Sequence, residues 1–144
     1  MKKKFVYSEV FSTNEKNIIY EKISNFRGTT QSIGSNKYLK IYNKDLALLA
    51  ETAFYKISHF LRKSHLQKLS KIIKDKEASS NDKYVALTLL KNANIAAGGI
   101  LPMCQDTGTA IILGKKGNKI ITDGQDHKFL SKGIFNCYKN NNLR

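Results

Sequence analysis

Cysteine is scarce in this sequence of 144 residues, which contains only Cys104 and Cys137. Two thiols cannot complete a tetrahedral zinc site, and the three histidines, at positions 59, 65 and 127, are not spaced as ligand pairs beside either thiol. A disulfide is not expected either, because such bonds are rare in cytosolic proteins. The cysteine content therefore argues against a domain held together by zinc or by a disulfide.

Long apolar runs are also missing. No stretch approaches the roughly 20 apolar residues that a membrane-spanning helix needs. The sequence opens with three lysines after Met1, but it lacks the apolar region and the small-residue cleavage site of a secretory signal. We therefore expect a cytoplasmic protein with no membrane partner.

Arginine is rare, although the chain is strongly basic. Lysine and arginine together number 25 against 11 acidic residues, which gives a formal net charge of +14, and only Arg27, Arg62 and Arg144 are arginines. The lysines are spread along the whole chain, whereas specific readers of nucleic acid depend on arginine. We favour a solvated basic surface, and keep a small nucleic-acid-binding module as the alternative from another class.

Hydrophobic periodicity predicts a mainly helical chain. Apolar residues at three- and four-residue steps predict a helix that begins at Asn43, its expected N-cap, and runs through Leu61. Further helices are predicted over residues 64–75, 84–97 and 126–140. The helix over 84–97 is apolar on most of its circumference, which predicts that most of its surface is buried. Gly98 and Gly99 end this helix.

The strand predictions concern shorter segments. Residues 18–20 and 38–42 have strand-like alternation and are separated by an expected loop over 27–35. Residues 110–113 and 119–122 flank a glycine-bounded connection, which is typical of a hairpin. The predicted fold class is α+β, mainly helical with a small antiparallel β-hairpin or sheet.

The loop of residues 101–109, LPMCQDTGT, carries an unusual density of reactive and hydrogen-bonding side chains. They are Cys104, Gln105, Asp106, Thr107 and Thr109. Pro102 and Gly108 limit and shape the backbone around them, as a preorganised site requires. From spacing alone, however, a small buried apolar role for Cys104 is favoured over a ligand role, and the loop is a candidate site without a reaction.

The motif LPMCQDTGTA at 101–110, with the runs 78–87 and 94–112 around it, closely resembles the class I, iron-sulfur fumarate hydratases. The resemblance continues through residues 114–117 and 133–136 to the run 141–144. It covers nearly the whole chain but only about the N-terminal quarter of the single-chain enzymes of that family. The resemblance implies the N-terminal part of the iron-sulfur fumarase α domain, and a homodimer for the full-length enzyme.

The resemblance also implies roles for four residues. Cys104 would be one of three cysteine ligands of a [4Fe-4S] cluster, and Gln105 and Asp106 would contact fumarate or malate. Asp106 would also take part in proton transfer, and Arg144 would grip a substrate carboxylate. Cys137 inherits no ligand role, and we interpret it as a packing residue.

These roles imply that the chain is an incomplete hydro-lyase for fumarate and (S)-malate. We expect an extended N-terminal segment over residues 1–42 and a partial catalytic domain over 43–144, truncated at its C-terminus. One thiolate cannot retain a cluster, so the chain alone should be inactive. The related tartrate dehydratases and a decayed gene remnant remain alternatives.

Overall fold

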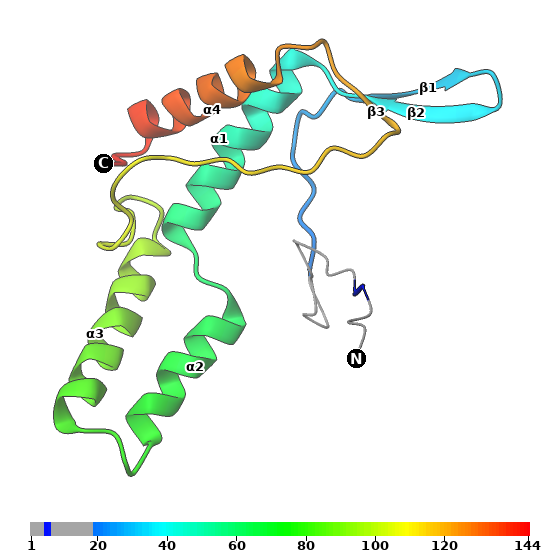
Figure 1. Ribbon diagram of the computed structural model, residues 1–144. Coiled ribbons are helices and arrows are strands. Elements are labelled where there is room, and N and C mark those ends of the chain that lie inside the picture. Colours follow the sequence, from blue (N-terminus) through cyan, green and yellow to red (C-terminus); the bar gives the residue numbers. More distant parts are fainter. Residues whose placement is uncertain (1–4, 7–18) are drawn as a thin grey trace.

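The computed structural model describes residues 5–6 and 19–144. In that part the elements are, in chain order, β1 (Thr29–Ile33), β2 (Asn36–Lys40), α1 (Asn43–His59), α2 (Lys63–Lys74), α3 (Ser80–Ala96), β3 (Ile120–Ile121) and α4 (Asp126–Asn140) (Figure 1). The predicted α+β class with mainly helical content is confirmed. None of the helices in the described part is long and apolar enough to cross a membrane.

Helices α1 and α4 form the most extensive packing contact of the fold. They approach so closely at Gly133 that a Cβ atom there would lie 2.1 Å from the Ala47 carbonyl oxygen and 2.8 Å from the Ala50 Cβ. Ala50 of α1 and Cys137 of α4 are both buried. Small side chains therefore allow α4 to lie directly against α1.

Helices α2 and α3 form a second pair, which projects away from α1 and α4 (Figure 1). The predicted burial of α3 on most of its surface is wrong. Its buried residues are Ala86, Ala93 and Ala96, whereas larger side chains such as Tyr84 and Ile95 are exposed. The reason is that α2 covers one side of α3 and α1 touches it only slightly within the described residues.

The beginnings of two helices differ from the predictions. Helix α3 begins at Ser80 rather than at residue 84, because Ser79 caps it and exchanges hydrogen bonds with Asp82. The N-cap of α1 is Tyr42 and not Asn43. There the buried carboxylate of Asp45 accepts hydrogen bonds from the Tyr42 N–H (3.1 Å) and the Arg27 N–H (2.9 Å), so a first-turn aspartate replaces the expected cap.

The three strands form one mixed sheet in the order β1–β2–β3. Strands β1 and β2 are antiparallel, with Thr29 opposite Lys40 and Ile33 opposite Asn36. Strand β3 joins β2 in parallel, with Leu39 opposite Ile120. A small antiparallel hairpin is therefore present, as predicted, but the sheet as a whole is not purely antiparallel.

The residues that build this sheet are not those expected. The predicted loop over 27–35 contains β1, which turns into β2 at Gly34 with φ +58°. The predicted hairpin of 110–113 with 119–122 does not form, because β3 pairs with β2 instead and 110–113 belongs to no strand. Ile19 and Tyr20 also lie outside any strand, and Ile18 lies outside the described residues. The predicted division of the chain after residue 42 stays a prediction.

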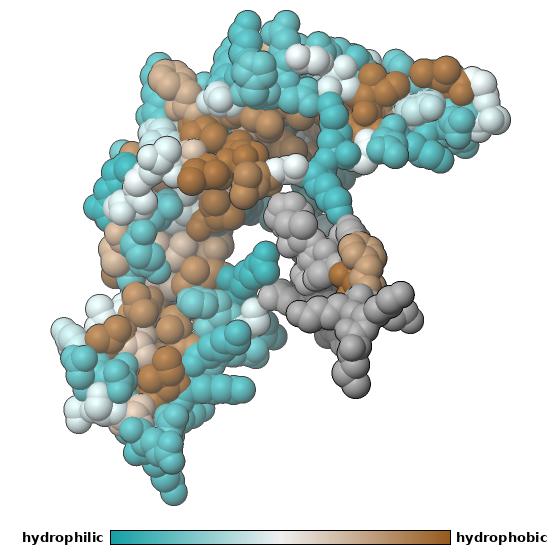
Figure 2. All heavy atoms as spheres, viewed as in Figure 1, coloured by the Kyte–Doolittle hydropathy of each residue, from teal (hydrophilic) through white to brown (hydrophobic). Residues whose placement is uncertain are grey.

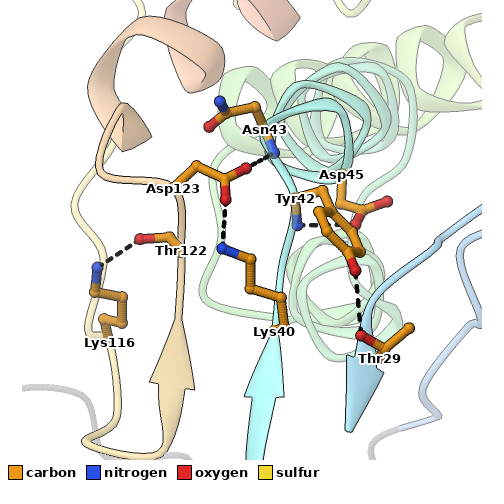
Figure 3. A network of polar contacts seen from close by, with 8 residues as sticks. All are labelled: Thr29, Lys40, Tyr42, Asn43, Asp45, Lys116, Thr122 and Asp123. Carbon is orange, nitrogen blue, oxygen red and sulfur yellow. Dashed lines mark hydrogen bonds and ion pairs between the residues drawn. The ribbon is translucent and has the colours of Figure 1, made fainter. Parts of the chain in front are cut away.

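A polar network ties the sheet to the helices (Figure 3). The Lys40 side chain pairs with Asp123, whose other carboxylate oxygen accepts a hydrogen bond from the Asn43 N–H (3.3 Å). The Lys40 hydrogen bond lowers the pKa of the Asp123 carboxyl below its ordinary value. Asp123 therefore links β2, the first residue of α1 and the segment that leads into α4.

Candidate functional site

The loop of residues 101–109 follows a sharp turn at the end of α3. Gly99 has φ +75°, which side chains rarely allow, and a Cβ atom there would lie 2.5 Å from the Tyr55 hydroxyl oxygen of α1. Beyond the turn, the Met103 side chain is buried, and its N–H donates to the Ser58 carbonyl oxygen (2.9 Å). The start of the loop is thus fastened to the C-terminal end of α1.

Cys104 lies directly after this anchor and is exposed. Its backbone N–H donates to the side-chain oxygen of Asn92 on α3 (3.0 Å), and its Sγ lies 3.4 Å from the Gln105 side-chain oxygen. The loop backbone is therefore held from both sides, by α1 through Met103 and by α3 through Asn92. The thiol itself is left accessible to a ligand.

Gln105 and Asp106 form a tight turn after Cys104. The Asp106 N–H donates to the Met103 carbonyl oxygen (3.0 Å), and the Thr107 N–H donates to the Gln105 carbonyl oxygen (3.0 Å). Gly108 then has φ +105°, a conformation that favours glycine. This turn leaves the Gln105 side chain exposed and the Asp106 carboxyl half-buried.

Arg144 reaches the loop from the other end of the described chain. Its Nη2 donates to the Cys104 carbonyl oxygen (3.0 Å), and the Asn142 amide donates to the Ile100 carbonyl oxygen (3.3 Å). The fold therefore brings together all four residues singled out in the sequence, since Cys104, Gln105 and Asp106 are consecutive and Arg144 touches the first of them.

Cys137 lies in α4 and is fully buried. Burial, together with the carboxylates of Glu51 and Asp106, raises the pKa of the Cys137 thiol, while a hydrogen bond from Asn141 acts in the opposite direction. These features agree with the predicted packing role.

Two residues that hold the site were not anticipated from the sequence. Asn92 anchors the Cys104 backbone, and Asn142, with φ +54°, anchors the chain just before Arg144. The available signal for the first was a polar side chain within a helix that the sequence predicts to be largely apolar. Asparagine tolerates the left-handed conformation, which is the signal for the second.

The side chains around the loop offer few donors for a metal ion. Residues 5–6 and 19–144 contain no group of three or more histidine, cysteine, aspartate or glutamate side chains arranged to hold a metal ion. The exposed thiol of Cys104 nevertheless fits the part of a single soft ligand. A thiolate-bound metal here would need further ligands from outside the described residues.

The two thiols should react very differently. At about pH 8, iodoacetamide should modify Cys104 and spare Cys137 in the folded chain, because the first thiol is exposed and the second is buried with a raised pKa. Mass spectrometry of the digested protein measures both sites. Denaturant should make both cysteines reactive, and equal labelling without denaturant would contradict the described burial.

Comparison with known proteins gives a consistent result. Residues 47–144 match the family described as "Fumarate hydratase (Fumerase)". The chain is 58% identical to "Fumarate hydratase 2" of Leishmania major over 106 residues, which are 74% of this chain and 19% of that protein. It is 44% identical to "Fumarate hydratase class I, anaerobic" of Escherichia coli strain K12 over 142 residues, 99% of this chain and 26% of that protein.

The aerobic class I enzyme of the same Escherichia coli strain gives 43% identity over 142 residues, with 99% of this chain and 26% of that protein covered. The chain therefore spans about a fifth to a quarter of the length of these relatives.

Proposed function

Because this chain belongs to the family of class I fumarate hydratases, we propose that it supplies part of a hydro-lyase site for fumarate and (S)-malate. The observation that carries the proposal is the contact between Arg144 and the Cys104 loop, which brings a guanidinium to the segment that carries a thiol, an amide and a carboxyl. The named relatives are all fumarate hydratases, so we propose fumarate rather than tartrate as the substrate.

Arg144 is suited to bind a substrate carboxylate. A guanidinium carries five N–H donors in a planar fork, and the hydrogen bond to the Cys104 carbonyl oxygen uses Nη2. That bond orients the fork beside the loop and leaves donors on the other nitrogens for a carboxylate. Fumarate and malate each have two carboxylates, and Arg144 would hold one of them.

Gln105 and Asp106 would serve the reacting carbons. Hydration adds a hydroxyl to one carbon of the double bond and a proton to its neighbour, and the reverse reaction removes both. The Gln105 amide can donate to and accept from the hydroxyl or carboxylate of malate. The Asp106 carboxyl, next in the turn and half-buried, would hold or deliver the proton that the neighbouring carbon gains or loses.

Cys104 would bind the iron-sulfur cofactor implied by the family resemblance. A bound [4Fe-4S] cluster with an open iron position supplies a Lewis acid for the C–O bond of malate. The role of Cys104 is to hold that group beside Gln105 and Asp106, and the Asn92 hydrogen bond fixes its backbone for this task. The other ligands would come from outside these 144 residues, since the only other cysteine, Cys137, is buried.

A chimera tests this proposal directly. In it, the present chain replaces the matching region of the class I anaerobic enzyme of Escherichia coli, which is 26% of that protein. After anaerobic reconstitution with iron and sulfide, we expect the chimera to convert fumarate to malate, measured by the loss of fumarate absorbance. The present chain alone should show no conversion, because one accessible thiol cannot retain a cluster.

Either of two results would contradict the proposal. One is a folded, iron-loaded chimera that does not hydrate fumarate, and the other is full activity of the chain alone. Cytoplasmic location and a homodimeric complete enzyme stay predictions, and one relative in Leishmania major is named a mitochondrial enzyme.

A further inference from the structure

The segment of residues 110–113, Ala-Ile-Ile-Leu, follows the loop and is unusually exposed for its composition. Ile111 and Leu113 are 73% and 80% exposed, whereas Ile112 between them is 38% exposed. This alternation is that of an extended strand, with Ile112 facing the protein and its two neighbours facing outward. Both faces of the segment are thus apolar.

The backbone of this segment also lacks hydrogen-bond partners in the backbone of the described residues. Within the described part of the chain, no backbone–backbone hydrogen bond joins the N–H or carbonyl groups of 110–113 to another residue. A strand that faces water on one side normally alternates apolar and polar residues, whereas an apolar strand on both faces is typical of one covered on both faces. The segment has the composition of an interior strand without its neighbours.

Apolar side chains gather along this part of the chain. Figure 2 shows them over the region where the trace of residues 100–120 crosses α1 in the view of Figure 1. Ile100 and Leu101, at the start of the same connection, are 74% and 56% exposed. The apolar area that Figure 2 shows is typical of an interaction surface.

The occupant of this surface follows from the length of the relatives and from the charge. The chain covers 26% of the Escherichia coli class I enzymes, so about three quarters of such a protein lies outside it. A second copy of this chain is a poor candidate, because each copy carries a net charge of +14 and two copies would repel each other. A free backbone edge is recognised by another strand through main-chain hydrogen bonds.

We propose that residues 110–113 form a docking strand that pairs with a strand of the polypeptide corresponding to the remaining three quarters of the class I relatives. This inference rests on the proposed function, because it names the partner that would complete the site. Asp106 lies four positions before Ala110. Docking at 110–113 would therefore bring the partner's ligands up to the loop that holds Cys104.

Hydrogen exchange tests the docking strand in the chimera described above. We expect the amides of 111–113 to exchange freely in the chain alone and about a hundredfold or more slowly in the chimera, as newly hydrogen-bonded strand amides do. Free exchange of these amides in a folded chimera would overturn the proposal. So would slow exchange in the chain alone that accompanies its dimerisation, because the second copy would then be the occupant.

A pair of double variants gives a second readout. Ile111→Lys with Leu113→Lys should lower the thermal midpoint of the chimera and leave that of the chain alone unchanged, because both side chains are exposed until docking. The matched control, Ile33→Lys with Tyr84→Lys, adds the same charge at positions that are 57% and 69% exposed elsewhere. Equal effects of the two pairs on the chimera would contradict the docking strand.

These results are separable from those on activity. A chimera with slow exchange at 111–113 that cannot hydrate fumarate would keep the docking strand and refute the proposed function. An active chimera with free exchange at 111–113 would support the proposed function and refute the docking strand.

Discussion

Cys104→Ser in the chimera should lower the rate of fumarate hydration about a thousandfold or more, equivalent to about 4 kcal/mol of transition-state free energy. Cys104 is the exposed one of the two cysteines and the ligand that we propose, and a serine hydroxyl is a harder, much weaker ligand for iron. The cofactor should therefore be lost or displaced. Iron content, measured after reconstitution, should fall together with activity.

The exposure of Cys104 separates this effect from a loss of folding. Its side chain packs against no buried core, so the thermal midpoint of the isolated chain should not change in Cys104→Ser. Cys137→Ala is the matched control: it removes the buried thiol, lowers stability and should leave the iron content intact. Retention of both iron and activity in Cys104→Ser would refute the proposed ligand role.

Gly133→Ala should destabilise the isolated chain by about 2–3 kcal/mol, because the added methyl group overlaps the backbone of α1. Its Cβ would lie 2.1 Å from the Ala47 carbonyl oxygen, and neither helix can move without opening the α1–α4 contact. The sign of this effect is informative. In an exposed helix interior, the same substitution would stabilise by up to about 1 kcal/mol through helix propensity.

Thermal and urea unfolding measure this change. We expect the midpoint of Gly133→Ala to fall by about 5–10 °C, on the scale of a few degrees for each kcal/mol in a chain of this size. Gly114→Ala is the control, because a Cβ atom there meets nothing within 4 Å and the backbone φ is not positive. A midpoint for Gly133→Ala at or above that of the original chain would show that α1 and α4 do not pack as described.

The same variant bears on the site. Helix α4 leads to Arg144, and Arg144 reaches the Cys104 carbonyl oxygen only while α4 lies against α1. A displaced α4 should move the guanidinium away from the loop. In the chimera, Gly133→Ala should therefore raise the KM for fumarate by more than the loss of stability alone would explain.

Helices were predictable from sequence because their hydrogen bonds join residues four apart. The positions of α1, α2 and α4 follow the apolar periodicity closely, whereas α3 begins four residues before the predicted position because Ser79 and Asp82 cap it. Burial was less predictable. The apolar pattern of α3 indicated a covered helix, yet a helix is buried only where another element reaches it, and the described fold covers one side.

Strand pairing was the least accurate prediction, because strands pair with segments that can lie far away in the chain. Strand β3 pairs with β2, about 80 residues earlier in the chain, and not with its neighbour at 110–113. A strand pattern says that a segment can pair but does not identify its partner. The network through Asp123, which joins β2 to the start of α1, was equally invisible in the sequence.

The loop of residues 101–109 shows the same division. Its chemical character was determined by the sequence alone, because Cys104, Gln105 and Asp106 are consecutive and any fold keeps them together. The tertiary structure decided that the Cys104 thiol is exposed, that Asn92 holds its backbone, and that Arg144 lies against it. The last two of these facts depend on residues 12 and 40 positions away, which only the packing of α3 and α4 against the rest of the chain can bring to the loop.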